Sequence, residues 1–391
     1  MGAVVKAGHN RSTAATGVAP LLIKADGRIS ALDGLRGIAS LMVVAYHFGP
    51  HIVRDANSGF VFLHRLPPLW FEGVDLFFVL SGFLISGILV GARESPRYFQ
   101  TFYARRLLRI FPLYYLVLLG YGLAIALWRV DTSTRLFENP LPVWTYATYL
   151  QNFAMAASNT FGPIWLAGSW SLAIEEQFYL TLPTVIRRVS DRGLFRIAFV
   201  GFVGAPLVRA LIQLFKFLPP IANYVLLPTR VDALAAGVLV MLAMRHRERW
   251  VMMHRRGIVW GTVSVFLVWT LYPYLPNSLA IRLGFINSSV TAATFALILL
   301  SLLIFPMSVA ARLFSTRPMR NFGNMAYSTY LFHPILLCVA FRFIRGRDPT
   351  LVGFRDMLPV GIAGVSTLGL SWLSWSQVES RLLRIGHRFH Y

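Results

Sequence analysis

The chain has very little cysteine and little charge for its length. Among 391 residues there is one cysteine, Cys338, and charged residues make up 14% of the sequence. A single cysteine excludes an intramolecular disulfide and a thiolate metal cluster. Paired aspartates, which a metal-dependent glycosyltransferase needs, are also missing from the sequence, so we expect no metal site. Hydrophobic residues make up 56% of the chain and the mean hydropathy is +0.59, which excludes an ordinary soluble globule.

Acidic residues are scarce as well. Sixteen of them stand against 37 lysines and arginines, which gives a formal net charge of +21. Such a charge can indicate a nucleic-acid partner. Here the basic residues are spread over short loops between apolar runs, with no soluble domain to form a groove, so we expect no nucleic acid to bind. The basic loops suit contact with the anionic headgroups of a lipid bilayer.

Long apolar runs recur from one end of the sequence to the other. They predict an all-α polytopic membrane bundle of about ten transmembrane helices, multi-pass in the cell (inner) membrane. The predicted spans are residues 31–50, 73–92, 106–128, 169–187, 196–217, 226–244, 257–273, 285–305, 322–342 and 357–378. We divide the chain into a disordered basic N-terminal tail (1–30), a membrane domain (31–380) and a short C-terminal tail (381–391). The tail has no hydrophobic core before a cleavage site, so the first span is interpreted as an uncleaved start signal.

A further apolar stretch, residues 143–157, is short and aromatic. We interpret it as a re-entrant or interfacial segment rather than a full crossing. With ten spans and both termini cytoplasmic, most lysines and arginines fall in cytoplasmic loops, as the positive-inside rule requires. An eleventh span at 143–157 would move the arginines of residues 187–196 to the other side, so we predict ten spans.

The first predicted span contains two ionisable residues, Arg36 and His47. An ionisable group in hydrocarbon costs roughly 2.5–3.5 kcal/mol, so it normally faces a protein or water-filled interior and marks a functional path. Eleven helical steps leave the two side chains within about 20° of the same face and about 16 Å apart along the axis. Asp33 and Ser40 fall near the same stripe. One face of this helix is therefore predicted to be polar.

Three arginines, Arg105, Arg106 and Arg109, lie at the cytoplasmic start of the third span. Spacings of three and four residues place their guanidinium groups on one helix flank. If the cluster opens onto a polar bundle interior, it is suited to hold a polyphosphate through bidentate hydrogen bonds. The competing interpretation is that these arginines only set the membrane topology.

Other polar residues at membrane depth are candidate supporting residues of a site. They are Asp75, Ser81, Ser171, Glu175, Glu176, Tyr179, Arg230, Asp232, Tyr330 and His333. Ser171, Glu175 and Tyr179 recur at four-residue steps and so share a helix face. Two adjacent carboxylates in a spanning helix are costly, so at least one of Glu175 and Glu176 is expected to pair with an arginine of another helix or to stay protonated. A lone histidine on an apolar helix, such as His333, is most often satisfied locally.

Six segments carry a resemblance to a known family: LDGLRGIASLMVVAYH, GVDLFFVLSGFLIS, RRLLRIFPLYY, WSLAIEEQFY, TRVDALAAG and YSTYLFHPI. In this order they resemble the motif blocks of the acyltransferase-3 family of membrane O-acyltransferases, from about Leu32 to the last span. The most specific feature is an arginine and a histidine with ten residues between them, followed by an arginine pair with two between them. Members look like bacterial inner-membrane enzymes. They move acyl groups, often acetyl, from cytoplasmic acyl-coenzyme A to sugar hydroxyls of surface glycans or secreted glycosides.

The resemblance implies roles for four residues. The family's catalytic histidine falls on His47, its paired arginine on Arg36, and its arginine motif on Arg106 and Arg109. It also implies acyl-coenzyme A as co-substrate, with no permanently bound cofactor, and a carbohydrate or glycoside acceptor. A neutral imidazole has the basicity to take a proton from an attacking hydroxyl near pH 7.

Two features of this mechanism stay open at the level of sequence. The group that orients the histidine is one of the acids Asp33, Asp75, Glu175 and Glu176. A covalent acyl intermediate on Ser81, Ser171 or His47 is the alternative to direct transfer.

Two further alternatives concern the whole chain. Some members look like two-part proteins with a C-terminal extracytoplasmic hydrolase-like domain, and we expect none here, because the chain stops at Tyr391. The protein then either acylates its acceptor unaided or passes the acyl group to a separate extracytoplasmic partner. The second functional hypothesis is a transporter or flippase of a glycoside or lipid-linked sugar, since many spans with buried charges also fit that class. The two halves of the sequence show no repetition, which argues against a transporter.

Overall fold

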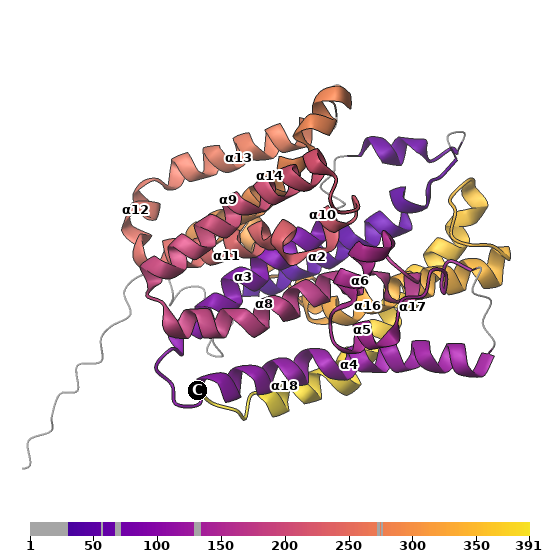
Figure 1. Ribbon diagram of the computed structural model, residues 1–391, viewed down its shortest axis with the longest axis horizontal. Coiled ribbons are helices and arrows are strands. Elements are labelled where there is room, and N and C mark those ends of the chain that lie inside the picture. Colours follow the sequence, from indigo (N-terminus) through magenta and orange to yellow (C-terminus); the bar gives the residue numbers. More distant parts are fainter. Residues whose placement is uncertain (1–29, 56–57, 67–71, 129–133, 272–273, 275–276) are drawn as a thin grey trace, which may run out of the picture.

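The computed structural model describes residues 30–55, 58–66, 72–128, 134–271, 274 and 277–391. Within these ranges every regular element is a helix, which confirms the predicted all-α membrane bundle. The long helices run roughly side by side (Figure 1). Residues 1–29, most of the predicted N-terminal tail, lie outside the described ranges.

The chain contains both long and short helices. The long ones are α2 (Ser30–Phe48), α3 (Gly73–Gly91), α4 (Tyr98–Trp128), α8 (Ser169–Arg188), α9 (Asp191–Phe215), α11 (Leu227–His246), α13 (Arg255–Leu271), α14 (Asn277–Ile304), α16 (Arg317–Arg345) and α17 (Met357–Ser374). The short ones are η1 (Pro50–Ile52), η2 (Val61–Arg65), α5 (Val143–Ala147), α6 (Gln151–Ser158), α7 (Ile164–Ala167), α10 (Ala222–Val225), α12 (Glu248–Met253), α15 (Val309–Phe314), η5 (Phe354–Asp356), the π-helical turn η6 (Trp375–Glu379) and α18 (Ser380–Gly386).

Each of the ten predicted spans coincides with one long helix. Seven helical segments in the described part have the length and apolar composition of a membrane span: Gly73–Gly91, Tyr98–Leu127, Asp191–Phe215, Ala222–His246, Gly284–Ile304, Arg317–Arg345 and Phe354–Gly386. The helix α13 has only 17 residues, and α2 and α8 contain charged residues that lower their mean hydropathy. The protein is a multi-pass membrane protein. The count of ten crossings and the cytoplasmic placement of both termini stay predictions.

Residues 143–157 form two short helices instead of one long helix. The helix α5 has five residues and α6 has eight, and Tyr149 between them has a left-handed backbone with φ 57°. A crossing helix needs about 20 residues, so neither helix spans a bilayer by itself. The hydroxyls of Tyr114 and Tyr115 on α4 donate hydrogen bonds of 2.9 and 2.7 Å to backbone carbonyls of this segment. The segment is therefore held against α4, as a re-entrant or interfacial element would be.

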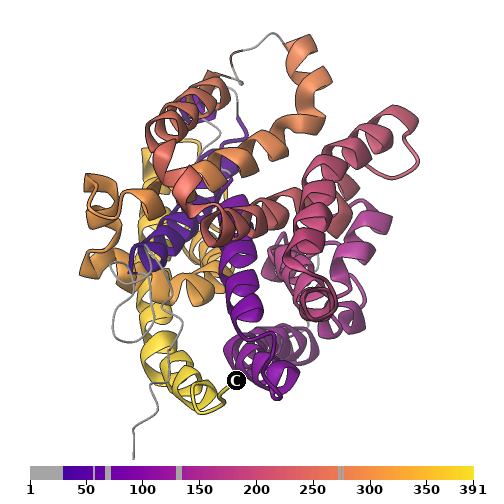
Figure 2. The same ribbon diagram turned by 90° about the vertical axis from the view of Figure 1, so that its left-hand side faces the viewer.

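The helices α2 and α3, in indigo and purple, lie in the inner part of the bundle, whereas α4 lies at its edge (Figure 2). Two glycines allow α3 and α11 to pack backbone to backbone. A Cβ atom on Gly82 would overlap the carbonyl oxygen of Leu234, and a Cβ on Gly237 would overlap the carbonyl oxygen of Val79. This agrees with the expected effect of small residues, which let membrane helices approach closely.

The Gly237→Leu variant is expected to lose more than about 3 kcal/mol of stability, because the added side chain meets backbone atoms that cannot rotate away. Thermal unfolding in detergent micelles measures the loss. Gly261→Leu on α13 is the matched control, since nothing lies within 4 Å of a Cβ atom there. Equal melting temperatures for Gly237→Leu and the control would contradict the close α3/α11 packing.

The helices α2 and α16 also pack closely, and they run in the same direction. A Cβ on Gly323 of α16 would overlap the carbonyl oxygen of Asp33 near the start of α2. Farther along, His47 of α2 contacts His333 of α16. The helix α2 therefore lies against α16 along most of its length.

The C-terminal residues lie along α4, as the yellow α18 beside the purple α4 shows (Figure 1). Thr101 donates a hydrogen bond of 2.9 Å to the carbonyl of His390. Arg105 donates two hydrogen bonds, of 3.0 and 2.6 Å, to the carbonyl of Phe389. The segment expected to be a short tail, 381–391, thus begins as a helix and ends against α4.

Candidate active site

A cavity lies among α2, α3, α4, α8, α16 and the π-helical turn η6. Eight residues that the sequence predicted for a site line it: Arg36, Ser81, Arg106, Arg109, Ser171, Glu175, Tyr179 and Tyr330. These residues come from five helices that are far apart in the sequence. Many of the polar residues predicted at membrane depth therefore line one cavity.

Three half-buried guanidinium groups face this cavity without a protein partner. In the part of the chain that the structure describes, Arg36, Arg106 and Arg109 form no hydrogen bond and no ion pair. Arg106 lies over the rings of Tyr179 and Phe102, with 5.4 and 5.8 Å between its guanidinium carbon and the ring centroids. Charged groups removed from bulk water are normally paired, because desolvation is costly. Three unpaired cations around one cavity are therefore suited to an anionic ligand.

Glu175, an acid that lines the cavity, accepts the last hydrogen bond of a short chain. Tyr179 donates to the Ser81 hydroxyl at 3.1 Å, and Ser81 donates to Glu175 at 2.6 Å. Among the described residues, no arginine forms an ion pair with Glu175 or Glu176, so the expected arginine partner is not found. The charges of the three cavity arginines act on Glu175 only from a longer distance. Glu176 leaves one buried carboxylate oxygen without a partner.

Sequence reasoning missed one acid of this cavity. Glu379 lines it and accepts a hydrogen bond of 2.8 Å from Ser374. It ends η6, a single π-helical turn, and such turns are frequent at functional sites. The predicted last span ended at residue 378, one residue before Glu379. An acid adjoining an apolar run was the signal that could have found it.

The predicted arginine cluster divides in the structure. Arg106 and Arg109 line the cavity, whereas Arg105 does not. The side chain of Arg105 binds the carbonyl of Phe389, and its guanidinium carbon lies 5.2 Å from the ring centroid of Tyr391. Arg105 therefore holds the C-terminal end of the chain in this structure.

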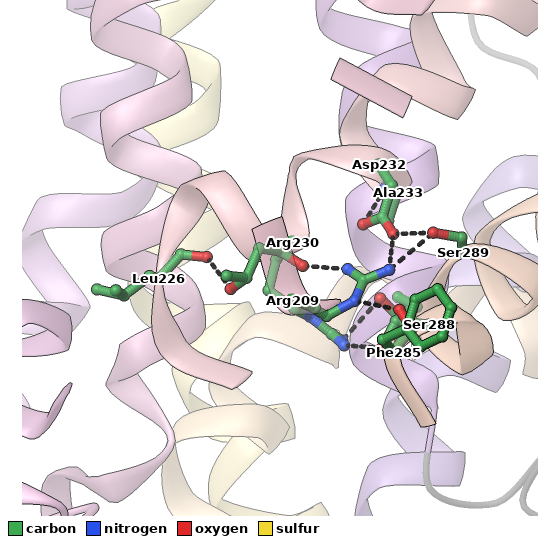
Figure 3. Close-up of polar contacts among 10 residues, drawn as sticks. Arg209, Leu226, Arg230, Asp232, Ala233, Phe285, Ser288 and Ser289 are labelled. Atoms are coloured by element: carbon green, nitrogen blue, oxygen red, sulfur yellow. Dashed lines mark hydrogen bonds and ion pairs between the residues drawn. The ribbon is translucent and has the colours of Figure 1, made fainter. Parts of the chain in front are cut away.

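Three other residues that the sequence predicted for the site, Asp75, Arg230 and Asp232, belong to two buried ion pairs. Arg230 donates to Asp75 at 2.7 Å and to Ser288 at 2.7 Å. The second pair joins Arg209 to Asp232 at 2.9 Å, and Ser289 donates to the same carboxylate (Figure 3). Arg230 and Asp232 thus link α11 to α3 and α9, which gives both residues a structural use.

Glu72 precedes α3 and lies close to the first ion pair. Burial, reinforced by the negative charge of Asp75, raises the pKa of the Glu72 carboxyl well above its usual value. A protonated Glu72 adds no second negative charge next to Asp75. One cation, Arg230, then faces one carboxylate.

Removal of one partner of the buried pair is expected to be costly. Arg230→Met leaves the Asp75 carboxylate buried and unpaired, and should lower the free energy of unfolding by about 3–5 kcal/mol. Adding Asp75→Leu should restore most of this stability, because no charge is then left behind. Thermal unfolding in detergent measures both variants, with Arg381→Met, at an exposed arginine, as the control. A double variant as unstable as the single one would count against the pair.

The two predicted histidines lie together but outside the lining of this cavity. The Nδ1 atom of His47 lies 2.9 Å from the carbonyl of Val43 and 3.2 Å from Nε2 of His333. His51 lies on another side of His47, with 5.2 Å between the ring centroids. Burial, together with the charges of neighbouring groups, lowers the pKa of His51 to about 3, so its ring is neutral at pH 7.

Tyr330 separates the histidines from the arginines. It lines the cavity, and its ring centroid lies 6.0 Å from that of His333, one turn later on α16. Its hydroxyl forms hydrogen bonds with Ser171 at 2.7 Å and with the carbonyl of Gly168 at 2.8 Å. The residues that line the cavity include Arg36 and Tyr330 but not His47, so Arg36 and His47 do not share one open cavity in this structure.

Comparison with known proteins supports the resemblance. The family model described as "Acyltransferase domain" matches residues 29–376. Peptidoglycan O-acetyltransferase OatA of Listeria monocytogenes serovar 1/2a is 25% identical over 377 residues, which cover 92% of this chain and 56% of the relative. A Bacillus subtilis protein, YrhL, provisionally named as a peptidoglycan O-acetyltransferase, is 30% identical over 341 residues, 79% of this chain and 49% of the relative.

The chain spans about half the length of these curated relatives. No solved structure matches it significantly. The family match nevertheless extends from the start of α2 into η6 and includes the five long helices that line the cavity, α2, α3, α4, α8 and α16. The chain therefore belongs to the acyltransferase-3 family, whose members share this acyltransferase domain.

Proposed function

We propose that the protein is a membrane O-acyltransferase that moves an acyl group, acetyl in the simplest case, from acyl-coenzyme A to a sugar hydroxyl. The observation that carries this proposal is the set of three unpaired guanidinium groups, Arg36, Arg106 and Arg109, around one cavity. Arg36 lies in the second turn of α2, near the predicted cytoplasmic end of the helix. Coenzyme A is supplied from the cytoplasm and carries phosphate groups that guanidinium groups bind in a bidentate manner.

The chemistry assigned to His47 is general-base catalysis. The attacking hydroxyl loses its proton to the imidazole while its oxygen forms a bond to the thioester carbonyl carbon. The carbon–sulfur bond then breaks, and the protonated imidazole returns the proton to the thiolate. Free coenzyme A and the O-acyl sugar are the products. Because Tyr330 lines the cavity and His47 does not, the acyl end of the donor has to pass this side chain before transfer.

The acceptor is proposed from the relatives. Two of them are named as acting on peptidoglycan, so a peptidoglycan sugar is one acceptor class. Other surface glycans, lipid-linked glycosides and secreted glycosides present the same hydroxyl chemistry. A separate extracytoplasmic protein is another possible class of acceptor, and it requires no change in the donor site.

Mass spectrometry of glycans and glycosides from the host cells tests the proposal. Cells that carry the gene should contain a sugar whose mass includes an added acyl group. Cells without the gene, and cells with a His47→Ala allele, should lack it. Identical acylation in all three strains would overturn the proposed function.

A further inference from the structure

His47 and His333 face one another across the contact between α2 and α16. Their ring centroids are 4.9 Å apart, with 59° between the ring planes. His333 is buried, with 1% of its surface exposed, whereas His47 is half-buried. The two rings therefore form a fixed pair at the core of the bundle.

Backbone carbonyls determine which nitrogen carries the proton in each neutral ring. A carbonyl oxygen only accepts, so Nδ1 of His47, 2.9 Å from the Val43 carbonyl, must be the donor. Nδ1 of His333 lies 3.0 Å from the Thr329 carbonyl and must donate as well. His333 then has a free lone pair on Nε2, and this atom lies 3.2 Å from Nδ1 of His47. The His47 proton is thus shared between a carbonyl and the second ring.

This arrangement leaves the other nitrogen of His47 unprotonated. In the part of the chain that the structure describes, Nε2 of His47 forms no hydrogen bond with the protein. An unprotonated, unpartnered ring nitrogen is the atom that a general base requires. No carboxylate takes the orienting position beside it, since Asp75 binds Arg230 and Glu175 binds Ser81. The acids considered from the sequence as orienting groups are not bonded to His47 among the described residues.

We propose that His333 is the positioning residue of the reaction, accepting the Nδ1 proton of His47 where a carboxylate usually does. This inference rests on the proposed function, because it assigns a role within the same transfer. When His47 takes the hydroxyl proton on Nε2, its ring becomes a cation. The hydrogen bond from Nδ1 to the His333 lone pair then strengthens and holds the cation in place. As the proton moves on to the leaving thiolate, both rings return to their neutral forms.

Other titratable groups around the pair do not replace His333. His51 and Tyr46 pack against the His47 ring, and Arg135 acts on it from a longer distance. His51 contacts the His47 ring but forms no hydrogen bond with it among the described residues, and Arg135 is a cation. Neither of these two stabilises a positive charge on His47. The neutral acceptor on His333 is the group placed to do so.

Two substitutions at His333 separate positioning from packing. His333→Gln keeps an acceptor oxygen near the place of Nε2, whereas His333→Leu keeps the volume and removes the acceptor. We expect His333→Leu to lower kcat by about 10- to 100-fold, the usual range for a hydrogen bond to a charged group, while KM for acetyl-coenzyme A stays within about twofold. His333→Gln should recover most of kcat. Equal kcat for the wild type and a folded His333→Leu would overturn the proposal.

Nitrogen-15 NMR of histidine-labelled protein tests the pair without measuring activity. The expected result is His47 protonated on Nδ1 and not on Nε2, with a coupling to Nε2 of His333 across the hydrogen bond. The signal is assigned by its loss in His47→Gln. A His47 ring protonated on Nε2 would overturn the proposal, even if His333→Leu does not fold. If the tautomer is as expected but no acyl transfer occurs in the wild type, the proposed function fails while the hydrogen-bonded pair stands.

Discussion

The His47→Ala variant is expected to lose acyl transfer by about 100- to 10,000-fold, the usual contribution of a general base. The reason is that the change removes the ring nitrogen to which the proposed function assigns the hydroxyl proton. His333 remains in place, but its Nδ1 is bound to the Thr329 carbonyl and its Nε2 loses the His47 ring that it orients. The measurement is the initial rate of thiol release from acetyl-coenzyme A by purified protein in lipid nanodiscs, with glycan fragments from the host cell surface as acceptor.

The matched control for this loss is His254→Ala. His254 directly follows α12, is exposed and stacks on Trp250, far from the pair in sequence. Its removal should leave the rate unchanged. A His47→Ala protein with the wild-type melting temperature and the wild-type rate would end the general-base assignment.

Charge removal at the cavity is expected to weaken donor binding strongly. Arg36→Gln and Arg109→Gln should each raise KM for acetyl-coenzyme A by about 10- to 100-fold, because each removes hydrogen bonds from a cation to phosphate. Neither arginine has a protein partner in the described part of the chain, so no partner charge is left unpaired by the change. The fold should therefore survive. Binding of coenzyme A to the variants, followed by calorimetry in detergent, gives the same comparison without turnover.

Arg105→Gln is the most closely matched control for these two variants. It removes an arginine from the same helix, one residue from Arg106, but its side chain is directed to the carbonyl of Phe389 rather than into the cavity. KM should stay within about twofold of the wild type. If Arg105→Gln raised KM as much as Arg109→Gln, the cavity would not be the donor site, and the cluster would bind the donor on the outer surface of α4.

The helices could be predicted from the sequence because their signal is local. Every long helix begins and ends close to a predicted apolar run, since about 20 apolar residues can satisfy their backbone only as a helix in lipid. Residues 143–157, which are too short and aromatic to predict a span, are divided at Tyr149 into two short helices. Part of the site followed from helix periodicity too, as Ser171, Glu175 and Tyr179 line the cavity together.

The partners of the charged residues could not be predicted, because they depend on which helices meet. Periodicity puts Arg105 and Arg109 on one flank, yet the C-terminal residues bind Arg105 and leave Arg109 in the cavity. In the same way, four acids were equally plausible partners for His47. The structure places another histidine, His333, beside it, from a helix 286 residues later.

A side chain of another helix stands between the proposed donor site and the proposed base, and this feature could not be predicted from the sequence. Arg36 and His47 share one helix face, but Tyr330 of α16 stands between their surroundings. The ring of Tyr330 is held by Ser171 and the Gly168 carbonyl, and Phe77 packs edge-on against it at 6.3 Å between centroids. A thioester that enters beside the arginines must displace this side chain to reach the imidazole.

The most direct test of the account is transfer of label across the membrane in oriented vesicles. Radiolabelled acetyl-coenzyme A is supplied only at the face that exposes the N-terminus of α2, and label is followed into glycan fragments enclosed on the opposite face. We expect acylated glycan and one free coenzyme A per acyl group with the wild-type protein, and neither with His47→Ala. Movement of the glycan across the membrane with no consumption of the thioester would contradict it.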